Sequence, residues 1–269
     1  MAGLEDDLRL AMELADTADR ITLARFQAGD LRVDRKPDRT PVTDADTTTE
    51  DALRALLASW RPRDAVLGEE RGLDPGKDAN GRAWILDPID GTKNFSRGVP
   101  VWATLIALTE SKRPTVGVVS APALGRRWWA SLGGGAYVRD GQGATRRLRV
   151  SRVSDLADAC LSTTELSSWS ELGALPNYLE LAQRCWVVRA FGDFWQHVLV
   201  AEGAIDLGVD AEANAWDLAS VQLIVTEAGG RFSDLDGVDG YEGGSGLSSN
   251  GLLHEPALDL LRPGHRPGP

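Results

Sequence analysis

Two aspartates in the segment Trp84–Phe95 have the residue type and spacing of a cation site. The segment reads Trp-Ile-Leu-Asp-Pro-Ile-Asp-Gly-Thr-Lys-Asn-Phe, so Asp87 and Asp90 lie three residues apart where an apolar strand ends. Pro88 and Gly91 fix the backbone around them, which lets both carboxylates point into one small volume. Two anions that close repel each other strongly unless a cation lies between them. A second explanation stays open at this point, because aspartates also organise tight turns.

Further acidic residues follow other predicted elements. Glu69 and Glu70 come directly after a short apolar strand. Asp46 lies where a helix begins, and Asp217 opens a helix directly after Trp216. Each position alone has an ordinary explanation as a surface charge or a helix cap, whereas one shared site explains all of them. A cluster of Asp and Glu oxygens without Cys or His favours a hard cation such as Mg²⁺, which prefers to share its ligands with a phosphate. The residue types therefore indicate phosphoryl chemistry rather than redox chemistry.

The composition is that of an ordinary globular protein, and it argues against several function classes. Of the 269 residues, 42% are hydrophobic and 26% are charged, which is enough for a real core. The formal net charge is −11, so we expect neither nucleic acid nor an anionic membrane as a partner. No apolar run approaches the ~18 residues that span a bilayer, and residues 1–10 are acidic where a signal peptide is basic, so we expect a cytoplasmic protein. With two cysteines and three histidines in the chain, oxygen must hold most of any metal.

Hydrophobic spacing predicts helices in the first part of the chain at 4–26 and 47–60, with short buried strands at 65–68 and 83–86. Apolar runs separated by Pro and Gly then predict an antiparallel meander over 102–108, 115–120, 127–131 and 136–138. Strands alternate with helices further on, an α/β pattern, over 159–163, 176–184, 185–189, 193–202 and 217–228. We expect an α+β half over 1–150 with most of the metal ligands, an α/β half over 151–261, and a disordered tail over 262–269.

Four acidic motifs in this order resemble the signature set of the inositol monophosphatase superfamily, a group of Mg²⁺-dependent, lithium-sensitive phosphatases. The motifs are Pro-Val-Thr-Asp-Ala-Asp at 41–46, Gly-Glu-Glu at 68–70, Asp-Pro-Ile-Asp-Gly-Thr at 87–92 and Trp-Asp-Leu-Ala at 216–219. They spread over most of the chain, and four motifs in register are far more specific than any one of them. The resemblance implies the layered αβαβα sandwich of sugar phosphatases, with metals in the cleft between the two halves, and a homodimer.

The resemblance also implies which residues hold the metals. The first Mg²⁺ takes Glu69, Asp87 and the backbone carbonyl of Ile89. The second takes Asp87, Asp90 and Asp217, so Asp87 bridges the pair. A third, weaker ion lies on the Glu69 side, which gives two or three ions in all.

The catalytic and phosphate-binding residues are implied in the same way. Thr92, together with Asp46, orients and deprotonates the attacking water. Asp46 rather than Asp44 matches the family position, and Asp44 is then expected to be a local cap. Gly91 and Thr92 bind the phosphate through backbone N–H groups if a helix begins there. Lys36 and Lys93 are the nearest cations in the motifs, and both a role at the site and a solvated surface position stay open.

The segment before Trp216 resembles one branch of the superfamily more than the others. It contains Arg189, Gly192, Asp193 and Phe194, an Arg-x-x-Gly-Asp-aromatic pattern like that of histidinol-phosphate phosphatases, which act late in histidine biosynthesis. Inositol phosphatases generally have a small or hydroxyl residue where this chain has Asp193. An anionic, aromatic-lined pocket suits the ammonium and imidazole groups of histidinol. The expected activity is hydrolysis of this small phosphate ester, with Arg189, Asp193 and Asp210 as substrate-binding residues.

Several alternatives remain open at this stage. Asp193 has an ordinary explanation as the cap of the helix that follows, with Phe191, Phe194 and Trp195 on its core face. Glu212 is an alternative to Asp210 as the substrate contact. A phosphatase of inositol or another sugar or nucleotide is the alternative activity. A regulatory binding protein with the phosphatase fold is an alternative of a different class, although such a protein is expected to have lost metal ligands.

Overall fold

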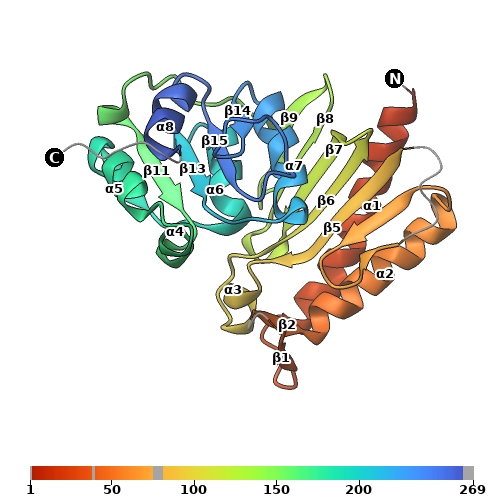
Figure 1. Cartoon of the computed structure of the whole chain (residues 1–269). Helices are drawn as coiled ribbons and strands as arrows, with labels where there is room; N and C mark the ends of the chain where they lie inside the picture. The colour runs from red at the N-terminus through yellow and green to blue at the C-terminus, as the bar shows by residue number, and fades with distance from the viewer. Residues whose placement is uncertain (1, 38–39, 75–80, 263–269) are drawn as a thin grey trace.

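Two β-sheets alternate with three layers of helices in the computed structural model, which describes residues 2–37, 40–74 and 81–262 (Figure 1). The outer layer on one side consists of α1 (Ala2–Arg25) and α2 (Asp44–Trp60), which pack on the larger sheet. The middle layer consists of α6 (Asp193–Ala201) and α7 (Ala215–Glu227). The layer beyond the smaller sheet contains α4 (Leu166–Glu171), α5 (Leu175–Arg184) and α8 (His254–Leu261). The αβαβα sandwich expected from the sequence is confirmed.

The larger sheet has eight strands in the order β10-β9-β8-β7-β6-β5-β3-β4. Every neighbouring pair is antiparallel except β3 and β5, and the run from β6 to β9 is the predicted meander. Its central strands are apolar on both faces because helices cover both faces. The strands are β3 (Ala65–Gly68), β4 (Gly72–Leu73), β5 (Arg82–Asp90), β6 (Ala103–Glu110), β7 (Arg113–Ala121), β8 (Arg126–Ser131), β9 (Gly135–Arg139) and β10 (Thr145–Arg147).

The smaller sheet has five strands in the order β12-β11-β13-β15-β14. Strand β11 lies parallel to β12 and β13, as the α/β pattern predicts, whereas β15 is antiparallel to both neighbours. The sequence reading missed β13, β14, β15 and α8. Gly246–Ser249 is short and polar, yet Ser248 and Ser249 are fully buried in the sheet. The strands are β11 (Cys160–Thr163), β12 (Val187–Arg189), β13 (Leu207–Asp210), β14 (Arg231–Ser233) and β15 (Gly246–Ser249).

The central core joins the two halves of the chain. One cluster of buried side chains contains Leu105 and Trp128 from the larger sheet, Phe194 and Leu218 from the middle helices, and Phe232 from the smaller sheet. The last strand of the first sheet ends at residue 147 and the first strand of the second begins at residue 160. A boundary near residue 150 stays a prediction for two halves that share this core. Of the predicted tail, residues 263–269 lie outside the described residues.

Shorter elements complete the part of the chain near α2. Strand β2 (Pro41–Thr43) pairs with β1 (Val33–Arg35). Helix α2 begins at Asp44 rather than at residue 47, because Thr43 and Asp46 form a capping box. Helix α3 spans Thr92–Ser96, and single 3₁₀ turns lie at 122–124 and 156–158. Among the described residues, no helix combines the length and the apolar character needed to cross a membrane.

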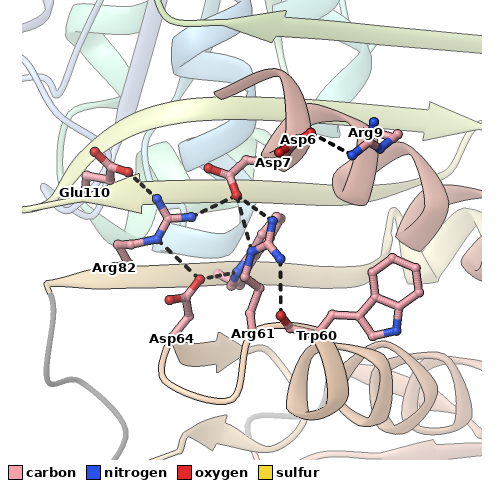
Figure 2. Close-up of polar contacts among 9 residues, drawn as sticks. Asp6, Asp7, Arg9, Trp60, Arg61, Asp64, Arg82 and Glu110 are labelled. Carbon is pink, nitrogen blue, oxygen red and sulfur yellow. Dashed lines mark hydrogen bonds and ion pairs between the residues drawn. The ribbon is translucent and has the colours of Figure 1, made fainter. Parts of the chain in front are cut away.

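A network of buried charges fastens the start of α1 to the larger sheet (Figure 2). Arg82 of β5 donates to Asp7 of α1 at 2.9 Å and to Asp64 at 3.4 Å, and it also pairs with Glu110 at the end of β6. Arg61, just beyond α2, reaches the same Asp7 oxygen at 3.1 Å. Asp7 and Asp64 are almost completely buried, so these pairs satisfy charges that have lost most of their water.

Candidate active site

A bulge at the end of β5 brings Asp87 and Asp90 to the same side of the sheet. In a regular strand, residues three apart point to opposite faces. Here Asp87 pairs with Leu105 and Asp90 with Ala103, so β5 advances three residues while β6 advances two. Pro88 lies inside the bulge, where it has no N–H to offer the ladder. The carboxylate of Asp87 also accepts the backbone N–H of Ile89 at 2.9 Å. Asp87 therefore organises the turn in addition to its place in the carboxylate cluster described next.

Asp217 completes a cluster of three carboxylates. It lies in the first turn of α7, where its Oδ2 accepts the N–H of Asn214 at 2.7 Å in a capping box. One oxygen from each of Asp87, Asp90 and Asp217 lies within 4.8 Å of the others. Burial raises the pKa values of Asp87 and Asp90 well above the ordinary range, and the neighbouring carboxylates raise them further. Burial also raises the pKa of Asp217 to about 7. Three anions here are incompatible with one another unless a cation joins them.

The donor atoms fit Mg²⁺. All three carboxylates offer hard oxygen ligands, and Glu69 lies on the wall of the same cavity as Asp90 and Asp217. The Glu69 carboxylate itself is 2.7 Å from Lys36 Nζ, and Lys36 also lies 2.8 Å from Glu70. Lys36, whose role the sequence left open, is therefore the charge partner of the Gly-Glu-Glu segment.

Thr92 and Asp46 meet beside the cluster. The Thr92 hydroxyl lies 3.2 Å from Asp46 Oδ1 and 2.9 Å from the Ile89 carbonyl oxygen. Asp46 is fully buried, and burial raises its pKa to about 7, although Thr43 donates to its other oxygen from both hydroxyl and backbone. Asp44 instead pairs with Arg25 at 2.8 Å, away from Thr92. The expectation that Asp44 caps the helix is wrong, because the cap residue is Thr43.

A cavity of about 560 Å³ lies between the two halves of the chain and receives these groups. Its floor carries Asp90, Gly91, Thr92 and Asp217. Gly91 has φ +83°, and a Cβ there would lie 3.1 Å from the Val101 carbonyl, so glycine suits this corner. The second half of the chain contributes five acidic residues to the other walls, and Lys93 pairs with the first of them; they are Glu165, Glu171, Asp193, Asp210 and Glu212.

Asp193 faces this cavity and does not cap a helix. The N-cap of α6 is Gly192, which has no side chain to cap the helix. Asp193 has φ +48°, an uncommon conformation for a residue other than glycine, and its Oδ2 accepts from Asn94 Nδ2 at 3.3 Å. Burial raises its pKa to about 6, with a further contribution from Asp210. The capping alternative is therefore wrong, and the carboxylate stays available to the cavity.

The predicted aromatic lining is smaller than expected. Phe191 and Trp195 pack against the central core, and the cavity wall contains Phe194 and Trp216. Phe194 is itself 1% exposed, so its ring is mainly a core group.

Asp210 lies on the same wall at the end of β13, and its oxygens are fully engaged. Oδ1 accepts from Thr164 Oγ1 at 2.6 Å and from Gln196 Nε2 at 2.8 Å, and Oδ2 is 2.8 Å from His197 Nε2. His197 also lies 2.7 Å from Ser248 Oγ through its other ring nitrogen. The sequence reading missed Thr164 and His197. Thr164 directly follows β11, and the carboxyl ends of parallel strands are a usual place for ligand contacts, so that signal was available.

Arg189 is not at the site. It lies exposed on β12, the edge strand, where its guanidinium donates to the Val188 carbonyl at 2.8 Å, and it is not among the residues that line the cavity. The expectation that Arg189 is a substrate-binding residue is corrected, because Arg189 lies outside the cavity. Glu212, the alternative to Asp210, is exposed and does line the cavity.

Comparison with known proteins places the chain in one family. The model of the inositol monophosphatase family matches residues 4–262. A histidinol-phosphatase of Mycobacterium tuberculosis is 53% identical over 96% of this chain and 99% of its own, and one of Streptomyces coelicolor is 51% identical over 95% and 97%. The solved structure of the extragenic suppressor protein SuhB from Bartonella henselae superimposes with a TM-score of 0.87 at 26% identity, over 97% of this chain and all of that one. With its carboxylate cluster, its layered fold and these relatives, the chain belongs to the inositol monophosphatase family.

Proposed function

We propose that the protein is a Mg²⁺-dependent phosphomonoesterase that hydrolyses L-histidinol phosphate to L-histidinol and phosphate. One structural observation supports this most directly. A single cavity is lined by Asp90 and Asp217 of the carboxylate cluster and, on another wall, by Asp193. The relatives of Mycobacterium tuberculosis and Streptomyces coelicolor, more than half identical to this chain, are named histidinol-phosphatases.

The metal ligands in this proposal are Glu69, Asp87, the carbonyl of Ile89, Asp90 and Asp217, which together would hold two or three Mg²⁺ ions. The three clustered aspartates are buried or half-buried, and their raised pKa values identify a site that gains from a bound cation. Bound Mg²⁺ neutralises phosphate charge and makes a water molecule more acidic.

The protein's own residues supply the proton transfer and the phosphate contacts. Thr92 would orient the attacking water and pass a proton on to Asp46 Oδ1, and the 3.2 Å between the two side chains supports this role. Because the pKa of Asp46 is about 7, this carboxylate can accept a proton near neutral pH. The N–H groups of Gly91 and Thr92, at the start of α3, would hold the phosphate.

Substrate choice is assigned to the acidic wall. The ammonium group of histidinol would pair with Asp193, whose carboxylate has the Asn94 amide as a hydrogen-bond partner and, among the described residues, no ion pair. Asp210 is bonded to Thr164, Gln196 and His197, so it shapes this wall and adds negative charge. Inositol has no cationic group, so it would gain no charge pairing from this acidic wall.

A substrate panel tests the proposal. At millimolar Mg²⁺, kcat/KM should be highest for L-histidinol phosphate among four esters, the others being inositol 1-phosphate, fructose 1,6-bisphosphate and 3′-phosphoadenosine 5′-phosphate. Equal or higher efficiency on any competitor would overturn the substrate assignment in favour of a sugar or nucleotide phosphatase. No phosphate release from any ester would favour the regulatory binding protein, although the five metal-ligand positions and Thr92 are all present.

We also propose that the protein forms a homodimer through the β12 edge. Trp186, directly before β12, is 75% exposed, and Leu172, just beyond α4, and Leu179 of α5 are about half exposed. Within the described residues, β12 pairs with β11 alone. A second copy would cover both the apolar side chains and the free strand edge. Sedimentation should show a dimer that Trp186→Glu converts to a monomer, and a monomeric wild-type protein would rule the dimer out.

A further inference from the structure

A buried carboxylate outside the cavity is bonded to the segment that carries Glu69. Glu50 of α2 has no exposed surface. Its Oε2 accepts the backbone N–H of Glu70 at 2.7 Å and its Oε1 accepts the N–H of Arg71 at 3.0 Å. These are the two residues that follow Glu69, so the Glu50 carboxylate fixes the backbone on one side of that residue.

Arg54, one helical turn further along α2, forms with Glu50 a clamp on the segment that carries Glu69. Its Nε donates to Glu50 Oε1 at 2.7 Å, which gives the buried anion a cationic partner. Its Nη2 donates to the Gly72 carbonyl at 2.5 Å and its Nη1 to the Val66 carbonyl at 3.4 Å. The pair therefore holds the turn between β3 and β4 from both strands.

Gly68 is part of the same arrangement. A Cβ built at Gly68 would lie 2.2 Å from Glu50 Oε1 and 2.4 Å from its Cδ. The carboxylate occupies the space that any other residue's side chain would need, and it lies 18 positions away in the sequence from the glycine that admits it. The glycine of the Gly-Glu-Glu motif is thus required by Glu50 rather than by its own backbone angles.

The backbone of Glu69 is held on both sides. Its N–H donates to the Leu86 carbonyl at 3.2 Å, one residue before Asp87, and Glu50 holds the next two N–H groups. Asp46 lies on the same helix four residues before Glu50, one turn away, and reaches Thr92. One helix face therefore supports both the residue proposed to accept the proton and the turn that carries a metal ligand.

We propose that Glu50, with Arg54, is a positioning residue that holds Glu69 in place for Mg²⁺. This inference rests on the proposed function, since it concerns the metal site of that reaction. Glu50 itself touches neither metal nor substrate. Residues that hold metal ligands in place typically change metal affinity or activity 10- to 100-fold when replaced.

The test is Mg²⁺ binding measured by calorimetry without substrate, together with unfolding temperature and Mg²⁺-dependent kinetics. In Glu50→Gln one oxygen becomes an NH₂ group, which cannot accept a backbone N–H. We expect the Mg²⁺ dissociation constant to rise about 10- to 100-fold, with kcat at saturating Mg²⁺ changed much less. Two further variants should weaken Mg²⁺ binding in the same way: Gly68→Ala, which pushes the Glu50 carboxylate aside, and Arg54→Lys, which has a shorter reach. They provide the test if Glu50→Gln does not fold.

Glu202→Gln is the matched control. Glu202 is also a buried carboxylate, bonded to Trp128 Nε1 and Arg126 at 2.8 Å, but it lies away from the cavity. The Glu202→Gln variant should have a lower unfolding temperature and an unchanged Mg²⁺ affinity. Wild-type Mg²⁺ affinity in the folded Glu50, Gly68 or Arg54 variants would overturn the inference. A wild-type protein that binds no Mg²⁺ would overturn the proposed function as well, whereas one that binds Mg²⁺ but hydrolyses none of the esters would overturn the proposed function alone.

Discussion

Asp90 Oδ2 accepts the backbone N–H of Phe194 at 2.5 Å, across 104 residues of sequence. A carboxylate at the end of β5 thereby serves the first turn of α6, whose N-cap glycine has no side chain to do so. Asp193 directly precedes Phe194, so the bond that ties β5 to α6 also fixes the distance between the carboxylate cluster and the proposed substrate wall. The two parts of the cavity are therefore positioned as one unit.

Asp87→Asn should separate the role of the cluster in metal binding from its role in folding. We expect hydrolysis to fall about 100-fold or more, because metal stabilisation of charge is worth several kcal/mol. Mg²⁺ at 100 times its dissociation constant should stabilise the wild-type protein by about 2.7 kcal/mol, and the variant far less. In EDTA the variant should be at least as stable as the wild type, since it carries one anion fewer in a repulsive cluster. Near-normal activity would refute the bridging role of Asp87.

Asp193→Asn tests substrate choice without disturbing the backbone. Asparagine accepts a positive φ well, so the conformation at φ +48° should persist while the charge is lost. We expect kcat/KM for L-histidinol phosphate to fall about tenfold or more, since a hydrogen bond to a charged group is worth about 1.5–3 kcal/mol. Turnover of inositol 1-phosphate should change little. Asp193→Ala is a less clean variant, because it adds about 1–2 kcal/mol of backbone strain; an equal loss on both esters would argue for a structural role.

His254 should make stability depend on pH. It is fully buried, with its ring nitrogens 2.9 Å from Ser233 Oγ and 2.8 Å from Ser249 Oγ, and burial lowers its pKa to about 4. Between about pH 6.5 and pH 4 the unfolded chain binds a proton that the folded protein does not, so stability falls as pH falls. The loss is about 1.4 kcal/mol per pH unit and about 3 kcal/mol over the window. The site carboxylates with raised pKa values have the opposite effect in both wild type and His254→Gln, so the measurement is the difference between the two proteins. In urea unfolding at several pH values, the stability of the wild type relative to His254→Gln should fall as pH falls from about 6.5 to 4; an unchanged difference would contradict the prediction.

Asp7 and Asp6 offer a matched pair for the charge network at the start of α1. Asp7 is buried between Arg61 and Arg82, whereas the carboxylate of Asp6 is exposed and pairs with Arg9 (Figure 2). Asp7→Ala removes the buried carboxylate that Arg61 and Arg82 share, and it should lower the free energy of unfolding by about 3 kcal/mol. Asp6→Ala should change it by less than about 1 kcal/mol. Equal effects in denaturant titrations would show that the network adds no more than a surface pair.

The sequence by itself determined the residues of the carboxylate cluster, and the resemblance carried by its acidic motifs implied the family and the layered fold. Those features are local: each acidic motif follows an apolar strand or opens a helix, and the meander is visible as apolar runs separated by Pro and Gly. The expected contact between Thr92 and Asp46 rested on family resemblance, and the structure brings the two side chains together. The buried strand Gly246–Ser249 was not predicted because its side chains are small and polar. Composition does not reveal that the sheet buries them.

Tertiary structure alone decided which residues of the specificity segment reach the cavity. Arg189 and Asp193 are four residues apart, yet the first lies on a sheet edge and the second on the cavity wall. The difference arises because the backbone turns through positive φ at Gly192 and Asp193, and because Asp90 takes over the capping of α6. The clamp of Glu50 on the Glu69 turn is likewise a contact between distant segments. Such contacts depend on how helices pack on a sheet, so the spacing of residues along the chain does not predict them.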